Sequence, residues 1–169
     1  MSRGTAPPHL QQVGTAERTK ITLYPSDFEG MSGSRTHRVT STGQTFDTLA
    51  NLPNMSSSAT INLYVLWSTD STTTTQTATW RLRYAAVTPE TDATTASVAV
   101  LTSAIAADTV TATANMLQRT AAGVIDPNNV LEGDWLKLRL DCSAVSGLAL
   151  ATDVVNFHGV EIEFVRAVV

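Results

Sequence analysis

Cysteine is nearly absent from this chain of 169 residues, and long apolar runs are missing altogether. The single cysteine, Cys142, cannot form an intramolecular disulfide, and we expect it to be a small buried side chain. No apolar run approaches the roughly 18 residues that span a bilayer, so no membrane partner is expected. Residues 1–20 lack the apolar core of a signal peptide. We therefore expect synthesis in a cytoplasm without export by a recognisable signal.

Charged residues are also scarce, at 15% of the chain, and the net charge is −4 with a pI near 5.2. Proteins that bind nucleic acid need a basic face to neutralise phosphates, so nucleic acid is not an expected partner. With so few charges, much of the surface must consist of neutral Thr, Ser, Ala and Gln, or be covered by a partner. The 43% of apolar residues suffices for one core.

What the chain has in abundance is threonine, together with stretches in which apolar residues occur at every second position. This period of two is typical of half-buried strands. It is clearest in four stretches, Ile61–Trp67, Thr79–Tyr84, Trp135–Asp141 and Val154–Arg166. The predicted inward residues of these strands are Ile61, Leu63, Val65, Trp67, Trp80, Leu82, Tyr84, Leu136, Leu138, Leu140, Val160, Ile162 and Phe164. Gly159 is the expected site of a β-bulge.

Weaker patterns fill the remainder of the chain. They predict short strands over Lys20–Tyr24 and around Arg38–Thr40, and a strand that includes Val98 and Val100. Phe46, Leu49 and Leu52 are spaced to share one face, which suggests a strand end followed by a tight helical turn. One helical turn is expected over Thr102–Ala107 and a further strand over Asp108–Gln118, with Val110, Ala112, Ala114 and Met116 on one side. Turns are expected at Asp126–Asn129 and Glu132–Asp134.

These patterns predict about eight strands and no long amphipathic helix. Parallel strands need long crossovers, which are usually helical, so the sheets should be antiparallel. We predict an all-β protein with an antiparallel two-sheet β-sandwich, in jelly-roll order, over residues 20–169. Residues 1–19 are predicted to form an extended N-terminal arm able to lie across a neighbouring subunit. The interface candidates within this arm are Pro7, Pro8, His9 and Leu10.

The order of several short motifs resembles a β-sandwich domain of tailed-bacteriophage structural proteins. The motifs are Leu23-Tyr24-Pro25-Ser26-Asp27-Phe28, Leu52-Pro53, the strand ending at Trp67, Thr79–Tyr84, Gly133–Arg139 and Gly159–Phe164. The resemblance covers residues 20–166. It implies a virion protein, since related domains occur in capsid decoration (cement) proteins and at fibre tips, commonly as trimers. The Arg-Asp pair usual after the "GD-x-L" strand is here Leu140-Asp141.

Catalytic signatures are sparse. The sequence has no phosphate-binding glycine loop, HExxH, paired CxxC, EF-hand loop or G-x-S-x-G elbow, and His9, His37 and His158 are scattered. Glu161 and Glu163 lie about 7 Å apart on one strand face, near a glycosidase-like separation. We favour a solvated outer face instead, or ion pairs with Arg81, Arg83, Lys137 and Arg139. No enzyme activity, cofactor or metal is expected.

Trp135 is the most informative candidate. If Leu136, Leu138 and Leu140 are buried, alternation places Trp135, Lys137 and Arg139 on the opposite face. A large aromatic on an outer face indicates an interface with another chain, a covering loop or a glycan platform. We favour the interface.

A capsid decoration protein is the function that fits best. It would form a homotrimer on the capsid surface and clamp neighbouring copies of the major capsid protein, with many weak contacts adding over the lattice. The alternative is a tail or fibre module that recognises a host-surface glycan through the polar loop Ser68–Gln76.

Overall fold

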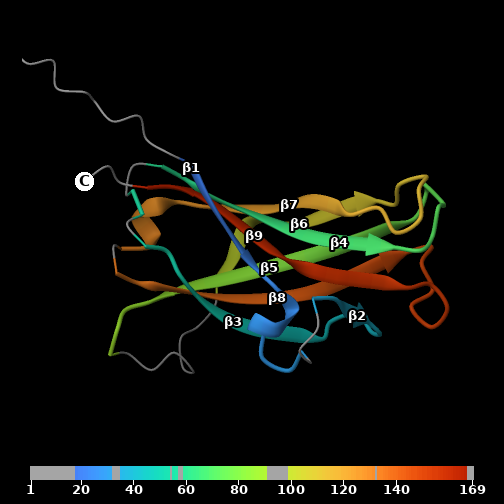
Figure 1. The fold of residues 1–169 in the computed structure, drawn as a ribbon, viewed down its shortest axis with the longest axis horizontal. Helices are drawn as coiled ribbons and strands as arrows, with labels where there is room; N and C mark the ends of the chain where they lie inside the picture. The colour runs from blue at the N-terminus through green and yellow to red at the C-terminus, as the bar shows by residue number, and fades with distance from the viewer. Residues whose placement is uncertain are drawn as a thin grey trace, which may run out of the picture.

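The computed structural model describes residues 18–31, 35–53, 55–56, 59–90, 99–131 and 133–166, with backbone alone for 99–106. Within these residues the chain forms two antiparallel sheets, which confirms the predicted β-sandwich (Figure 1). Their nine strands are β1 (Arg18–Leu23), β2 (His37–Val39), β3 (Thr45–Asn51), β4 (Ile61–Thr69), β5 (Thr77–Val87), β6 (Ala99–Thr109), β7 (Gln118–Ile125), β8 (Trp135–Ser146) and β9 (Val155–Val165). The short 3-10 turns η1 (Pro25–Asp27) and η2 (Pro127–Asn129) are the only helical elements of the described residues, and no helix there could cross a membrane.

The strand order is that of a jelly roll. Sheet A has the order β1-β9-β4-β7, with β2 also pairing to β9, and sheet B has the order β3-β8-β5-β6. If the short β2 is set aside, the eight longer strands pair first with eighth, second with seventh, third with sixth, and fourth with fifth. This nested pairing builds the two Greek keys of a jelly roll.

The core lies between the two sheets and is filled by the predicted inward residues. Those exposed by 1% or less are Ile61, Leu63, Val65, Trp67, Trp80, Leu82, Leu136, Leu138, Leu140, Val160, Ile162 and Phe164. The rings of Trp67 and Trp80, one from each sheet, are 6.1 Å apart. The indole nitrogen of Trp67 donates to Thr120 Oγ1 at 2.8 Å, so this large side chain is buried without an unmet donor.

The segment around Phe46 differs from its prediction. β3 is a continuous strand whose core face carries Phe46, Thr48 and Ala50, so Leu49 points outward and is 45% exposed. The predicted shared face of Phe46, Leu49 and Leu52 is therefore wrong, as is the helical turn. A spacing of three residues suits a helix, whereas a strand alternates with a period of two.

Two predictions between β5 and β8 are also wrong. Thr102–Ala107 is part of β6 and not a helical turn. The strand expected over Asp108–Gln118 ends at Thr109, and 110–117 form a loop in which Asn115 has a left-handed φ of 60°. In a stretch rich in Ala and Thr, an apolar residue falls at every second position by chance. The alternation over 108–118 therefore predicted a strand where the structure has the loop before β7. Val98 lies outside the described residues.

Residues of the "P-x-D-F" motif shape the turn after β1. The Asp27 carboxylate accepts a hydrogen bond from the Tyr24 backbone N at 2.7 Å, which fixes η1. Phe28 is buried and meets Phe157 of β9 edge to face, with ring centres 5.4 Å apart. These motif residues therefore have structural roles.

Gly133 and Gly159, which begin two further motifs, have positive φ angles that other residues adopt only with strain. Gly133 has a φ of +89° in the predicted turn, where Asp134 accepts from the Leu131 backbone N at 3.0 Å. Gly159 has a φ of +150° at a register shift between β4 and β9, which confirms the predicted bulge. A Cβ at Gly159 would overlap the carbonyl oxygen of Leu23.

The two ends of the sandwich differ. The loops β4–β5, β6–β7 and β8–β9 gather at one end, while β1 starts and β9 finishes at the other (Figure 1). Backbone hydrogen bonds join the first two of these connections, from Val110 N to Gln76 O at 2.9 Å and from Asn115 N to Thr69 O at 2.7 Å. We call this the loop end. It carries the exposed side chains of Met116 and Leu117.

Candidate interface on the outer face of sheet B

The predicted interface residues of β8 lie together on the outer face of sheet B. The cross-strand register arranges this face, which we call the sheet B face, in four rows: Asn51–Trp135–Val87, Leu49–Lys137–Ala85, Asp47–Arg139–Arg83 and Thr45–Asp141–Arg81. Residues directly opposite each other in an antiparallel pair point to the same side and lie close. The register therefore brings β3, β5 and β8 into one surface.

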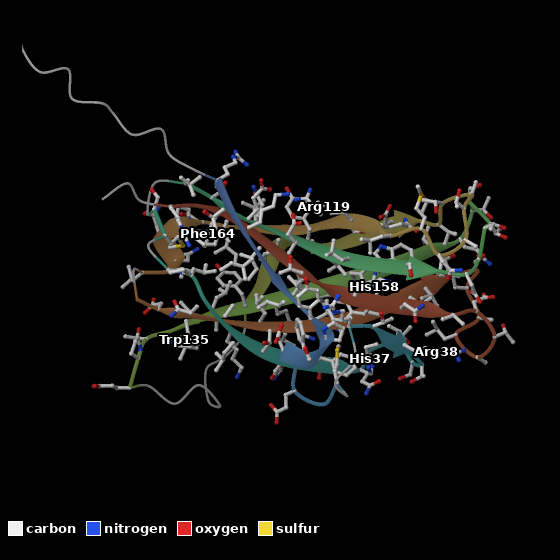
Figure 2. The ribbon with its side chains drawn as sticks, in the orientation of Figure 1. His37, Arg38, Arg119, Trp135, His158 and Phe164 are labelled. Atoms are coloured by element: carbon white, nitrogen blue, oxygen red, sulfur yellow. The ribbon has the colours of Figure 1, made fainter. Side chains whose placement is uncertain are left out.

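The first two rows are mainly apolar. Trp135 is 41% exposed, and Figure 2 places it on the opposite side of the molecule, as drawn, from Arg119 of sheet A. Val87, its direct partner, is only 6% exposed although it does not join the main core cluster. Lys137 is also buried, although alternation places it on the outer face. A lysine can be buried in this way when neighbouring side chains cover its aliphatic stem.

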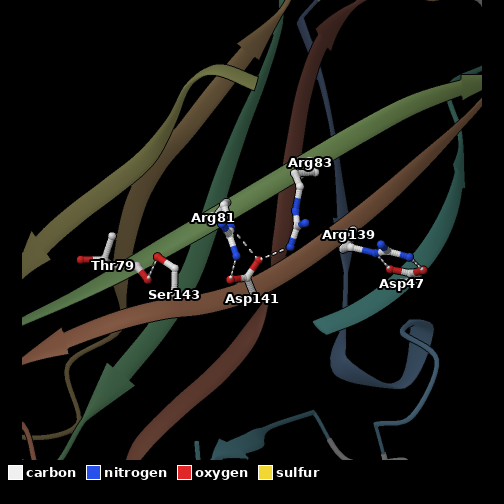
Figure 3. Close-up of polar contacts among 7 residues, drawn as sticks. All are labelled: Asp47, Thr79, Arg81, Arg83, Arg139, Asp141 and Ser143. Carbon is white, nitrogen blue, oxygen red and sulfur yellow. Dashed lines mark hydrogen bonds and ion pairs between the residues drawn. The ribbon is translucent and has the colours of Figure 1, made fainter. Parts of the chain in front are cut away.

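The other two rows are charged (Figure 3). The buried Asp141 carboxylate accepts hydrogen bonds from Arg81 Nε at 3.0 Å and Arg81 Nη2 at 2.8 Å, and from Arg83 Nη2 at 2.8 Å. Arg139 makes a second two-bond contact, to Asp47, with both distances 2.7 Å. The hydrogen bond from Arg139 lowers the pKa of Asp47 below its ordinary value, although burial opposes the shift. Both arginine–carboxylate pairs have the forked, two-bond geometry of strong charge-assisted contacts.

A groove of about 540 Å³ runs beside these rows. Its walls come from residues 26–29, which we call the η1 segment and which include Asp27 and Glu29, and from the sheet B face, with Leu49, Lys137 and Arg139. The Glu29 backbone N donates to Asp47 O at 2.7 Å, so the η1 segment covers part of the exposed edge of β3. Covering an edge strand in this way limits uncontrolled strand pairing.

The outer face of sheet A has its own ion pairs, and they correct one prediction. Glu161 pairs with Arg119 and with Lys20 at 3.3 Å, while Glu163 pairs with Arg119 at 3.4 Å and Arg18 at 3.6 Å. The predicted partners on β5 and β8 are wrong because those strands belong to the other sheet. Burial alone would raise the pKa of Glu161, but the hydrogen bonds from Arg119 and Lys20 lower it. These contacts account for the two glutamates as an ion-paired surface.

The histidines do not converge. His158 Nε2 lies 2.8 Å from Ser68 Oγ, and its Nδ1 lies 3.3 Å from Thr36 Oγ1, but Ser68 is buried between sheet strands. His37 packs its ring against Phe46 instead. Among the described residues, no three His, Cys, Asp or Glu side chains are placed to hold a metal ion.

The arm candidates Pro7, Pro8, His9 and Leu10 lie outside the described residues. Their role stays a prediction. The candidate site of the described residues is therefore the sheet B face with its groove.

The comparisons with known proteins do not show a family for this chain. No protein-family model and no curated protein matches the chain. A chain in the solved "Structure of infectious bursal disease virus Gt strain" superposes with a TM-score of 0.40 and 10% sequence identity, over 98% of this chain and 36% of that chain. The present chain thus spans about a third of the length of the chain it matches.

The sequence did not predict which residues neighbour one another on the sheet B face. Asp47 and Leu49 on β3 meet β8, and Arg81 and Arg83 on β5 meet it from the other side, only through the register. The signal in the sequence was the outward phase of Arg81 and Arg83 between buried residues. It shows which side they face, but not which strand is their neighbour.

Proposed function

We propose that this protein is a non-enzymatic structural component of a virus particle, and that it decorates a tailed-phage capsid. The observation that supports this best is the sheet B face, on which the exposed side chains of Trp135 and Leu49 lie beside arginines that are held by carboxylates. An aromatic side chain beside arginines, on a rigid strand, is the composition of many protein–protein interfaces. The jelly roll, frequent in viral capsid domains, is consistent with this role.

Under this proposal the partner is the major capsid protein, and the decorating unit is a homotrimer. A rigid sandwich that carries few charges would bind neighbouring shell subunits through repeated weak contacts, and the sum over the lattice would stabilise the head. The resemblance of the ordered motifs to phage structural domains supports the same location. No bond needs to be made or broken for this function.

Co-sedimentation with purified capsid shells that lack the protein tests the proposal. Wild-type protein should bind the shells and raise the temperature at which they lose their integrity. Trp135→Ala should weaken binding, while the matched control Met116→Ala, an exposed apolar side chain at the loop end, should not. Shells that neither bind the protein nor gain heat resistance would contradict the proposal.

A second candidate function is favoured by the loop end. The Thr-rich turn of residues 70–76 is joined by backbone hydrogen bonds to the loop that exposes Met116 and Leu117, and it lies opposite the start of β1. A rigid polar tip of this kind would suit a tail or fibre module that binds a host glycan. Adsorption to host cells that is lost in Met116→Ala and kept in Trp135→Ala would favour this second function.

A further inference from the structure

The charges of the sheet B face are already satisfied within the chain. Each charged side chain of its four rows interacts with another group of the protein: Asp47, Arg81, Arg83, Lys137, Arg139 and Asp141. The groove beside the rows is walled by the acidic Asp27 and Glu29 as well as by basic side chains, so its charge is mixed. A charged occupant would lose its hydration here without gaining an ionic partner. The face therefore favours an uncharged occupant.

What the face leaves unsatisfied is apolar. Trp135 is 41% exposed and Leu49 is 45% exposed, and the register makes them diagonal neighbours, because Asn51 is the direct partner of Trp135. Diagonal neighbours across an antiparallel pair are about 7–8 Å apart. Leu131, 66% exposed, lies in the turn that leads into β8. Exposed apolar side chains that gather in one region mark interaction sites, so this part of the face calls for an apolar partner.

A segment of that composition precedes β1. Residues 4–16 contain no Asp, Glu, Lys or Arg, and they include Pro7, Pro8 and Leu10. Consecutive prolines favour an extended backbone, and extended proline segments dock on aromatic side chains at a small cost in entropy. Such a backbone rises about 3.1 Å per residue, so Leu10 follows the two prolines by about 6–9 Å. This spacing matches that of the two exposed side chains on the face.

The point at which this segment joins the sandwich favours a neighbouring copy as its receiver. β1 starts at Arg18 and β8 starts at Trp135, both at the end opposite the loop end (Figures 1 and 2). Leu10 and Arg18 are eight positions apart, a span of about 25 Å in an extended chain. To meet its own Trp135, the segment would have to pass from sheet A around the end of the sandwich to the outer face of sheet B. A copy that lies alongside is reached without this turn.

We propose that residues 7–10 of one copy pack against Trp135 and Leu49 of the next copy, so that exchanged arms link the copies of a homotrimer. The prolines contact the indole ring, and the Leu10 side chain contacts Leu49. Because the giving and the receiving surfaces differ, the contact is head to tail, and such contacts close into a ring. The inference rests on the proposed homotrimer, but it needs no contact with a capsid shell.

Disulfide cross-linking between two full-length variants tests the exchange. Leu10→Cys, carrying an affinity tag, is co-expressed with untagged Leu49→Cys, and the purified protein is oxidised. Neither variant has both new cysteines, and Cys142 is buried, so a disulfide between tagged and untagged chains joins two copies. We expect a mixed covalent dimer that a reducing agent separates. In the matched control, Met116→Cys at the loop end replaces Leu49→Cys, and the mixed dimer should be lost.

Three results would overturn the inference. The first is the absence of a mixed dimer from the pair Leu10→Cys and Leu49→Cys. The second is a disulfide within one chain of the double variant Leu10→Cys, Leu49→Cys in place of the mixed dimer, since the arm would then cover its own copy. The third is a disulfide between two Leu49→Cys chains alone, which would show that two sheet B faces meet each other.

The fluorescence of Trp135 gives a second readout on the full chain. Trp67 and Trp80 are buried in the core, so acrylamide should quench mainly the emission of Trp135. Dilution of the wild-type protein should separate the copies, and the quenching constant should rise as the arms leave the indole ring.

Changes within the arm should have the same effect. The triple variant Pro7→Ser, Pro8→Ser, Leu10→Ser removes the apolar contacts, so it should be quenched more strongly and should weaken the association of copies about tenfold or more. Gln11→Ser, Gln12→Ser is the matched control in the same segment, and both quantities should equal those of the wild type. Equal quenching and association in the wild type and the triple variant would contradict the inference.

The shell assay separates this inference from the proposed decoration. If the wild-type protein does not bind shells, the proposed function fails, while the mixed dimer still decides the inference. If light scattering shows a monomer that binds shells and gives no mixed dimer, the decoration of capsids stands and the exchange of arms is wrong.

Discussion

Arg81 holds the buried carboxylate of Asp141 with two hydrogen bonds, of 3.0 and 2.8 Å, across the junction of β5 and β8. The pair lies on the outer face of its sheet, yet Asp141 is 0% exposed because Arg81 and Arg83 cover it. A fully covered carboxylate is stable only when its charge and its lone pairs are satisfied. Asp141 is thus the centre of the charged rows.

Replacement of Asp141 by alanine should destabilise the fold. It would leave two guanidinium groups without their shared carboxylate and next to Arg139, which adds repulsion. Loss of one member of a buried ion pair costs about 3–5 kcal/mol, and the partial exposure of the arginines reduces this to about 2–3 kcal/mol. Urea denaturation measures the change. Asp47→Ala, with one arginine partner and greater exposure, should cost about 1 kcal/mol, and equal costs would contradict the assigned roles.

Gly159→Ala should be among the most disruptive single-methyl changes in the chain. The residue has a left-handed φ of +150°, and the added Cβ would overlap the Leu23 carbonyl oxygen of the neighbouring strand β1. We expect a loss of more than about 3 kcal/mol in the free energy of unfolding. The control is Gly43→Ala, where φ is +78° but nothing lies within 4 Å, so only the backbone cost of about 1–2 kcal/mol applies. Similar urea midpoints for both variants would rule out the close approach between residue 159 and the Leu23 carbonyl oxygen.

The sheets could be predicted from the sequence where side chains alternate strongly in size and polarity. Leu136, Leu138 and Leu140 alternate with Trp135, Lys137 and Arg139, and the structure buries all three leucines in the core as the alternation predicts. The same rule failed over 108–118, where small Ala and Thr side chains give no contrast between faces. Periodicity carries information only when one face is clearly more apolar than the other.

The candidate site was only partly predictable, for a different reason. Trp135 could be assigned to an outer face from its own strand, but the partner of Arg139 could not, because Asp47 is 92 positions away along the chain. Glu163 was assigned the wrong cations for the same reason, since the sheet to which a strand belongs is set by topology. Local patterns determine the direction of a side chain, whereas the register determines its neighbours.

The thiol of Cys142 should be unreactive in the folded protein. Burial, with a further contribution from the charge of Asp141, raises its pKa to about 11. At about pH 8 this leaves roughly one thiolate per thousand molecules, and the sulfur is covered as well. Labelling with a disulfide reagent should therefore be slow in buffer and at least about a hundredfold faster in denaturant. Rapid labelling of the native protein would show that this end of β8 opens.

Acid should weaken the fold in two separate ranges of pH, and the upper range involves His158 and His37. Burial lowers the pKa of both histidines below 6.5, so the unfolded chain binds protons more readily than the folded one. Their contribution to stability is complete above about pH 6.5 and is lost as the pH falls from there through the folded pKa.

The carboxylates act in the lower range. The lowered pKa values of Asp47 and Glu161 mean that their contribution is complete above their unfolded values, near pH 4, and is lost only below them. A comparison of urea midpoints at pH 7.5 and pH 5.5 therefore isolates the contribution of the histidines. The wild-type midpoint should be lower at pH 5.5 than at pH 7.5. The double variant His37→Gln, His158→Gln should lose most of this fall. An equal decrease of the urea midpoint in the double variant would show that another group titrates in this range.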